Sequence, residues 1–116
     1  MFDGRRMLRT VIAAAGVAAT AGSAAWAEGE TSTPDGAILY RERTCIACHG
    51  PDAKTPILPE YPKTAGQNAA YTFQQMKDIK SGARSNGNTA AMRGVMHLVT
   101  EDEMKVLADY LASLEP

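Results

Sequence analysis

The stretch Cys45-Ile46-Ala47-Cys48-His49 decides how the rest of the chain is interpreted. The pattern C-x-x-C-H is typical of a site at which haem c is attached to a protein. The two thiols add across the two vinyl groups of the porphyrin, and this cysteine spacing fits that distance on a turn of chain. His49 then lies under the iron as its proximal ligand. The motif therefore predicts one covalently bound haem c, held through Cys45 and Cys48.

Two other kinds of C-x-x-C site fit this chain less well. A thioredoxin-like redox motif needs a βαβ context, and no alternating or β-branched run flanks Cys45 to Cys48. A structural zinc site needs four ligands at paired spacing. The chain has only two cysteines, and His97 is the one histidine besides His49. The motif therefore favours haem over zinc or disulfide chemistry.

The N-terminal segment has the features of a secretory signal peptide. A basic start is followed by residues 10–27, which carry no charge and are rich in alanine, and Ala25-Trp26-Ala27 forms an A-x-A cleavage signal. An uncleaved membrane anchor is the alternative, but a segment of mostly alanine and glycine is only weakly hydrophobic. We expect residues 1–27 to be cleaved, so that no stable membrane insertion remains. The domain then spans residues 28–116.

This domain is small and mildly acidic. It contains nine Lys and Arg against twelve Asp and Glu, a formal charge of −3, which gives no indication of nucleic-acid binding. A chain of this size buries little apolar surface by itself, and a flat apolar cofactor would supplement its core. Two hypotheses describe how the basic residues are distributed on the surface of this domain. They form a patch that steers acidic partners, or they are part of an evenly solvated surface. The basic residues concerned are Lys54, Lys63, Lys77, Lys80, Arg84 and Arg93.

The pattern of caps and apolar residues predicts an all-α domain of three to four short helices with long loops. Asp35 is placed to cap a helix that runs to about Arg43, with Ile38, Leu39 and Tyr40 as candidate inward residues. A second helix is expected from about Asn68 to Lys80, ended by Gly82.

The last helix is the clearest. Thr100 and Glu103 form a capping box, and an apolar stripe follows at helical spacing, made of Met104, Leu107, Ala108, Leu111 and Leu114. Between the helices, four prolines in residues 50–66 favour an extended loop. Residues 81–91 are rich in glycine and asparagine and are expected to be irregular.

An electron-transfer haem takes a second axial ligand, commonly methionine. Met76 and Met104 fall on predicted helix faces, where a place in the core is the ordinary explanation. Met92 and Met96 fall in a stretch expected to be irregular, which could fold across the far face of the haem. His97 is the competing ligand, although a lone histidine is more often exposed or hydrogen-bonded.

Three stretches of the chain resemble small class I bacterial cytochromes c, and are most similar to single domains of di-haem periplasmic cytochromes. The matching residues are Gly36, Leu39, Tyr40 and Cys45 to Gly50; Pro59, Pro62, Lys63, Ala65 to Gln67, Tyr71, Gln75, Asp78, Lys80 and Gly82; and Met92 to Leu114. The likeness covers nearly all of residues 28–116. Only one haem motif is present, so the chain resembles a monohaem version.

The resemblance implies the class I cytochrome c fold and assigns several residues. In that family the ligand methionine lies eight residues before the helix-capping Ser or Thr, which favours Met92 over Met96, since Thr100 is the cap. The family also implies that the Pro59 carbonyl accepts a hydrogen bond from the second ring nitrogen of His49.

The family likewise implies that the first and last helices cross. Gly36 should permit their close approach, with Tyr40 and Tyr110 packed nearby. Thr64 stands where the family usually has leucine, and Ala53 replaces a common glycine. Neither departure involves an iron ligand.

The function implied is electron transfer rather than enzymatic catalysis. The chain would shuttle single electrons in the periplasm, the side of the membrane on which c-type cytochromes receive their haem. Its redox partners would be a reductase or dehydrogenase donor and an oxidase or reductase acceptor. Two alternatives stay open: a cytochrome subunit of a periplasmic dehydrogenase complex, and a five-coordinate haem protein that binds a gas or peroxide.

Overall fold

The computed structural model describes residues 13–18, 22 and 34–116. The chain divides into two units, Met1–Glu30 and Thr31–Pro116. The few described residues of the first unit are exposed and without regular structure. The expected cleavage site after Ala27 lies outside the described residues, so the signal peptide stays a prediction. Within the part of the chain that the structure describes, no helix is long and apolar enough to cross a membrane.

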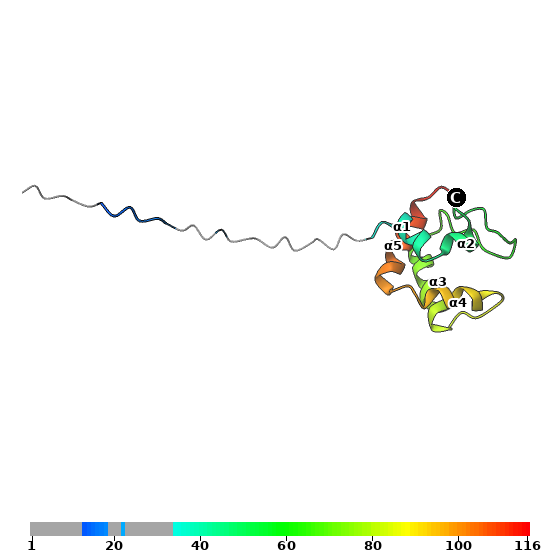
Figure 1. Ribbon diagram of the computed structural model, residues 1–116. Coiled ribbons are helices and arrows are strands. Elements are labelled where there is room, and N and C mark those ends of the chain that lie inside the picture. Colours follow the sequence, from blue (N-terminus) through cyan, green and yellow to red (C-terminus); the bar gives the residue numbers. More distant parts are fainter. Residues whose placement is uncertain (1–12, 19–21, 23–33) are drawn as a thin grey trace, which may run out of the picture. The chain divides into compact units, whose positions relative to one another are not determined.

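The second unit is helical, and its described residues contain no strand (Figure 1). Its helices are α1 (Gly36–Glu42), α2 (Cys45–His49), α3 (Ala69–Ser81), α4 (Thr89–Met96) and α5 (Glu101–Ser113). The all-α prediction is confirmed, with five helices among the described residues rather than three to four. The two additional helices, α2 and α4, are short.

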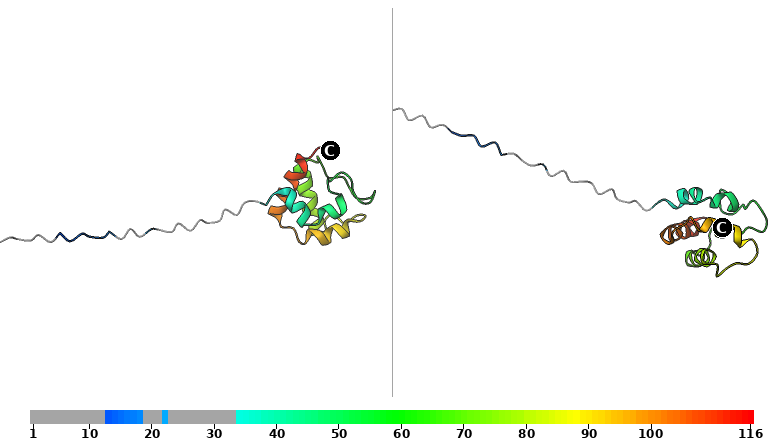
Figure 2. Two further views of the ribbon diagram at one scale, coloured as in Figure 1. Left: turned by 45° about the horizontal axis from the view of Figure 1, so that its top comes forward. Right: turned by 60° about the horizontal axis from the view of Figure 1, so that its bottom comes forward.

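Helix α5 lies between α1 and α3 and packs against both (Figure 2). Its start follows from the predicted capping box: the Thr100 hydroxyl accepts from the Glu103 N–H at 3.2 Å, and the Glu103 carboxylate accepts from the Thr100 N–H at 3.1 Å. The predicted stripe is buried at Met104, Leu107, Ala108 and Leu111. Each large apolar side chain buried in this way contributes about 1.5–3 kcal/mol, so α5 is the main support of the core.

Helix α1 crosses α5 at Gly36, as the resemblance implied. A Cβ atom at Gly36 would lie only 2.9 Å from Cγ of Tyr110 and 3.2 Å from the Val106 carbonyl oxygen. The rings of Tyr40 and Tyr110 pack with centroids 6.0 Å apart. Asp35 caps α1 by accepting from the Ala37 N–H at 2.7 Å. Leu39 and Tyr40 are buried as expected, whereas the inward placement of Ile38 is wrong, since Ile38 is half exposed.

Helix α3 begins and ends within one residue of the predicted range, Asn68 to Lys80. The Asn68 side chain accepts from the Tyr71 N–H at 3.2 Å, and Gly82 ends the helix in the left-handed conformation with φ of 86°. Met76 and Ile79 are buried on its inner face together with Thr72.

The expectation that Met92 and Met96 lie in an irregular stretch is wrong, because both are on α4. Alanine and methionine are strong helix formers, and two turns are enough to bury Met96 in the core and to pack α4 against α3. This packing outweighs the cost of Gly94 inside the helix, which is about 1 kcal/mol.

The loop after α2 has no helix, as its prolines predicted, but it is a series of turns and bends and not an extended chain. Its two ends are joined at Ala53. The Ala53 carbonyl accepts from the N–H groups of Thr64 and Ala65 at 2.8 and 3.0 Å. Ala53 is buried and has φ of 59°, a left-handed conformation that favours glycine. The left-handed conformation accounts for the glycine that is common in the family at this position. In this chain an alanine adopts the same conformation, and the two hydrogen bonds to its carbonyl hold the loop.

Candidate functional site

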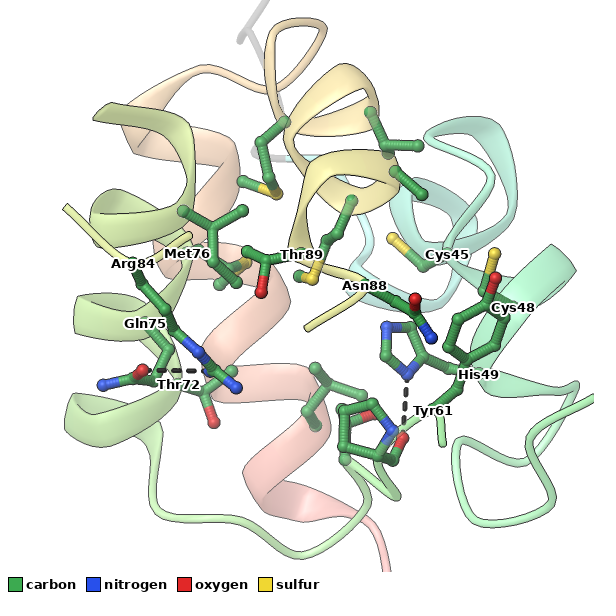
Figure 3. Close-up of a pocket in the computed structure, with 18 of the residues that line it drawn as sticks. Cys45, Cys48, His49, Tyr61, Thr72, Gln75, Met76, Arg84, Asn88 and Thr89 are labelled. Atoms are coloured by element: carbon green, nitrogen blue, oxygen red, sulfur yellow. Dashed lines mark hydrogen bonds between the residues drawn. The ribbon is translucent and has the colours of Figure 1, made fainter. Parts of the chain in front are cut away.

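A cavity of about 350 Å³ opens among the helices of the second unit (Figure 3). Its walls come from α2, from the loop around Tyr61 to Gln67, from α3, from the segment between Arg84 and Met96, and from the inner face of α5. Its volume lies within the range of cofactor pockets, which is about 300–1,000 Å³. The cavity is therefore large enough to receive a cofactor.

Helix α2 presents the C-x-x-C-H motif to this cavity. Thr44, in a left-handed conformation with φ of 63°, turns the chain between α1 and α2. Residues three and four apart share one face of a helix, so a single turn is enough to place Cys45, Cys48 and His49 along the same wall, and all three line the cavity. Figure 3 shows them together on one side.

Both motif cysteines are half-buried, and no disulfide joins them. Burial raises the pKa of the Cys45 thiol to about 11. Cys45 is therefore a neutral thiol at neutral pH, unlike the activated thiolate of a C-x-x-C redox enzyme. Among the described residues, no three His, Cys, Asp or Glu side chains are grouped so that they could hold a metal ion. The raised pKa of Cys45 disfavours a thioredoxin-like redox site.

The Nδ1 atom of His49 lies 2.9 Å from the carbonyl oxygen of Pro62. A carbonyl can only accept, so Nδ1 carries the proton and Nε2 keeps a free lone pair for iron. The assignment of this carbonyl to Pro59 is wrong; Pro59 is exposed and is not among the residues that line the cavity. Both prolines belong to the same irregular loop, and only the path of the loop determines which carbonyl reaches the histidine.

Both candidate methionines of α4 line the cavity, with different burial. Met92 is half-buried, whereas Met96 is 3% exposed and belongs to the core. Met76 also lines the cavity from α3 and is buried. His97 caps the C-terminus of α4, is exposed and does not line the cavity, so the structure does not bring the competing histidine to the site.

Three polar residues of the cavity wall were not singled out as a group from the sequence. Thr72 and Gln75 lie at i, i+3 on α3. Arg84, in the segment after the helix, donates to the Gln75 side-chain oxygen at 3.0 Å, and all three residues line the cavity. We call these three residues the polar corner. Figure 3 shows it on the side of the cavity away from Cys45 and Cys48. A threonine and a glutamine on the inward face that carries Met76 and Ile79 were the available sequence signal.

The hypothesis of a free basic patch receives little support. Lys77 pairs with Glu101 at 3.4 Å, Lys80 donates to the Val99 carbonyl at 2.5 Å, and Arg84 is engaged in the polar corner. Three of the six basic residues are thus committed within the fold, while Lys54, Lys63 and Arg93 are exposed.

Residues 34–115 match the profile of the cytochrome c family. The chain belongs to this family. Its cofactor is therefore covalently bound haem c, and Cys45, Cys48 and His49 fit the attachment motif. The residues present suit this group: two thiols, a histidine nitrogen with a free lone pair and a buried apolar wall all meet at one cavity.

The cytochrome is similar to cytochrome c4 of Stutzerimonas stutzeri, with 34% identity over 88 residues that make up 75% of this chain and 42% of the relative. It is 35% identical to cytochrome c-554(548) of Halomonas halodenitrificans over 62% of this chain and 86% of that protein. It is also 33% identical to a thiosulfate dehydrogenase electron acceptor of Stutzerimonas stutzeri strain A1501, over 76% of this chain and 39% of the relative.

A solved structure supports the fold. Reduced recombinant cytochrome c4 from Pseudomonas stutzeri matches with a TM-score of 0.63 and 33% identity, over 72% of this chain and 48% of that one. The chain thus spans about half or less of the length of the cytochromes c4 that it resembles. The structural match confirms the class I cytochrome c fold, and the partial coverage agrees with the predicted similarity to one domain of a longer cytochrome.

Proposed function

We propose that this cytochrome is a periplasmic electron carrier in which His49 and Met92 are the two axial ligands of a single haem iron. The observation that carries the proposal is that Cys45, Cys48, His49 and Met92 all line one cavity. When bound, haem c supplies reversible exchange of one electron at iron. With both axial positions taken by the chain, no open site would remain for a substrate, so the protein is a carrier and not an enzyme.

The residues of the chain hold and tune the cofactor. Cys45 and Cys48 fix it covalently, and the Pro62 carbonyl orients the His49 ring through the 2.9 Å hydrogen bond and makes its other nitrogen a stronger ligand. Met92 adds a soft, neutral thioether, which favours ferrous over ferric iron relative to a second imidazole. The apolar wall made by Met76, Ile79, Leu107 and Leu111 excludes water from the site.

Met92 is preferred to Met96 on two grounds. The family spacing to Thr100 selects it. Both methionines line the cavity, but Met92 is only half-buried, whereas Met96 is already enclosed by the core. A core methionine is the ordinary role of a thioether with 3% exposure. Met96 stays the alternative ligand.

A second candidate function keeps the haem site and changes the partner. The cytochrome would then be the cytochrome subunit, or a dedicated acceptor, of a periplasmic dehydrogenase. The similarity to proteins named thiosulfate dehydrogenase electron acceptor, in Stutzerimonas stutzeri and Thiomonas intermedia, favours this role. Co-purification of the native cytochrome with a larger redox enzyme would separate it from a free carrier.

Mass spectrometry and optical spectra test the proposal. The exported protein should have the mass of residues 28–116 plus one haem, and Cys45→Ala or Cys48→Ala should reduce covalent attachment. The ferric form should show the absorption band near the red edge of the visible that is diagnostic of Met–Fe(III). Free thiols after expression with the haem-attachment machinery would overturn the haem assignment, and a missing band would favour the five-coordinate alternative.

A further inference from the structure

We propose that Gly66 is a positioning residue for the iron-binding histidine, because it docks the loop that carries the Pro62 carbonyl onto the end of α5. The inference deepens the proposed function, in which His49 is an axial ligand, and it rests on that function. Gly66 lies in a stretch that matches the family, Ala65 to Gln67. Its contacts in the folded chain indicate what this glycine does.

The first anchor of the Pro62 carbonyl is Ala53, in the loop directly after α2. The Ala53 carbonyl accepts from the N–H groups of Thr64 and Ala65, at 2.8 and 3.0 Å. The Ala53 N–H donates in turn to the carbonyl of Gly50, the residue that ends α2, at 3.3 Å. This anchor therefore ties the segment of Pro62 to the short helix that carries the histidine.

The second anchor is Gly66, whose N–H donates to the Leu111 carbonyl at 2.8 Å. Leu111 lies in the last turn of α5, where the carbonyls of a helix lack their usual partners within the helix. The same carbonyl also accepts from the Leu114 N–H, at the longer distance of 3.3 Å. Leu111 is 6% exposed and lines the cavity. This anchor therefore fixes the Pro62 carbonyl relative to a wall of the cavity.

Residue 66 is suited to glycine for two independent reasons. Its φ is 71°, in the left-handed region that side chains disfavour. A Cβ atom here would also lie 2.9 Å from Cβ, Cδ and N of Pro116. Figure 1 shows the end of the chain after α5 beside the loop that follows α2, in agreement with this contact. A side chain at residue 66 would therefore push the loop away from α5 and weaken the hydrogen bond to Leu111.

A displaced loop should weaken the hydrogen bond between His49 and Pro62. This bond makes the imidazole a stronger donor, which favours ferric iron. In Gly66→Ala we expect the ferric–ferrous equilibrium to shift toward ferrous by about threefold, a factor typical of weakening one hydrogen bond. The Nδ1 proton of His49 should also exchange with solvent faster than in the wild type. Potentiometry measures the first quantity, and proton NMR of the ferrous holo-protein measures the second.

Gly36→Ala is the matched control. It also adds a methyl group against α5, where a Cβ atom would lie 2.9 Å from Cγ of Tyr110, but it does so at the crossing with α1 and not at the loop. A purely structural role of both glycines predicts that both variants lose stability and keep the potential of the wild type. We expect only Gly36→Ala to keep the potential and the rate of proton exchange.

A second pair of variants keeps the test decisive if Gly66→Ala does not fold. Pro116→Gly removes the Cβ and Cδ atoms that the new methyl group would meet. The double variant, Gly66→Ala with Pro116→Gly, then keeps mainly the strain of the left-handed backbone. It should have a higher potential than Pro116→Gly alone, and its Nδ1 proton should exchange faster.

The haem mass and the Met–Fe(III) band must stay unchanged in each variant, so that ligand loss is not the cause of a shift. An unchanged potential or an unchanged rate of proton exchange in Gly66→Ala would overturn the proposal. So would shifts in Gly36→Ala as large as those in Gly66→Ala or, where only the double variant folds, equal values in the double variant and Pro116→Gly. Failure of the proposed function shows separately, as a wild-type protein without covalent haem or without the band.

Discussion

His49 and Pro62 are joined by a hydrogen bond of 2.9 Å between a ring nitrogen on α2 and a carbonyl oxygen in the proline-rich loop. His49 is 8% exposed, so water competes little for this contact. The bond fixes both the tautomer and the orientation of the imidazole. The loop therefore helps to determine the electronic properties of the site, although it supplies no iron ligand.

Replacing Pro62 should change the reduction potential more than replacing Pro59. Proline restricts the chain by about 0.4–1 kcal/mol relative to a freer residue, so Pro62→Ala should loosen the carbonyl and weaken its bond to His49. A weaker bond makes the imidazole a poorer donor to iron, and the potential should rise. Pro59→Ala, at an exposed position of the same loop, is the control. A larger shift of the potential in Pro59→Ala than in Pro62→Ala would indicate that the Pro59 carbonyl, and not that of Pro62, accepts from His49.

Two glycine-to-alanine variants should have opposite effects on stability. Gly36→Ala places a methyl group 2.9 Å from Cγ of Tyr110 and 3.2 Å from the Val106 carbonyl oxygen, so α1 must move away from α5. Such overpacking costs about 1–3 kcal/mol. Gly94→Ala on α4 meets nothing within 4 Å and should stabilise by about 0.5–1 kcal/mol. Chemical denaturation of the two holo-proteins checks both signs, and a neutral Gly36→Ala would show that the two helices are not in close contact.

The ion pair between Arg43 and Glu103 should make stability depend on acid pH. The Arg43 guanidinium lowers the pKa of Glu103, and the Thr100 N–H acts in the same direction. A carboxyl whose pKa is depressed by folding stabilises the protein above its unfolded pKa of about 4.3, and this contribution is lost as the pH falls through the lower folded pKa.

Glu103→Gln should accordingly weaken the dependence of the free energy of unfolding on pH below about pH 5. Asp52, whose pKa is lowered by hydrogen bonds from Lys54 and Thr55, should retain its own part of this dependence. Lys105→Gln is the control for a lost charge on α5, because its pair with Asp109 is exposed. Equal acid sensitivity of Glu103→Gln and the wild type would show that the pair with Arg43 is not formed in solution.

Local signals in the sequence were sufficient for three helices. Asp35, Asn68 and Thr100 each cap their own helix through a side chain that bonds a backbone N–H two or three residues away. Such contacts depend only on neighbouring residues, so composition and spacing reveal them. The C-x-x-C-H motif is equally local, since one helical turn brings its reactive residues together.

Contacts between distant segments were not accessible in the same way. Helix α4 contains Gly94, and its two turns are stabilised by burying Met96 and by packing against α3, which no local pattern indicates. The choice of Pro62 over Pro59 depends on the path of an irregular loop. In the polar corner Arg84 bonds the Gln75 side chain, nine positions earlier in the chain, across the turn at Gly82. Each of these features is set by tertiary packing.

The identity of the methionine ligand is tested by two isosteric variants on α4. Leucine is close to methionine in volume and usually costs less than about 1.5 kcal/mol in a core, so both variants should fold. Met92→Leu should abolish the Met–Fe(III) band. It should also lower the reduction potential, because the iron loses a ligand that favours the ferrous over the ferric state. Met96→Leu, at a position with 3% exposure, should keep the band and change only packing. Covalent haem should be retained in both.

Absorption spectra and potentials of the two variants should be measured near neutral pH, because a lysine or His97 can replace a weak ligand at higher pH. His97 is exposed at the end of α4, one residue after Met96, so it could reach iron only if α4 rearranges. A band that survives in Met92→Leu and disappears in Met96→Leu would identify Met96 as the ligand. A band that survives in both would mean that α4 does not supply the ligand, and Met76, which lines the same cavity from α3, would then be the next residue to replace.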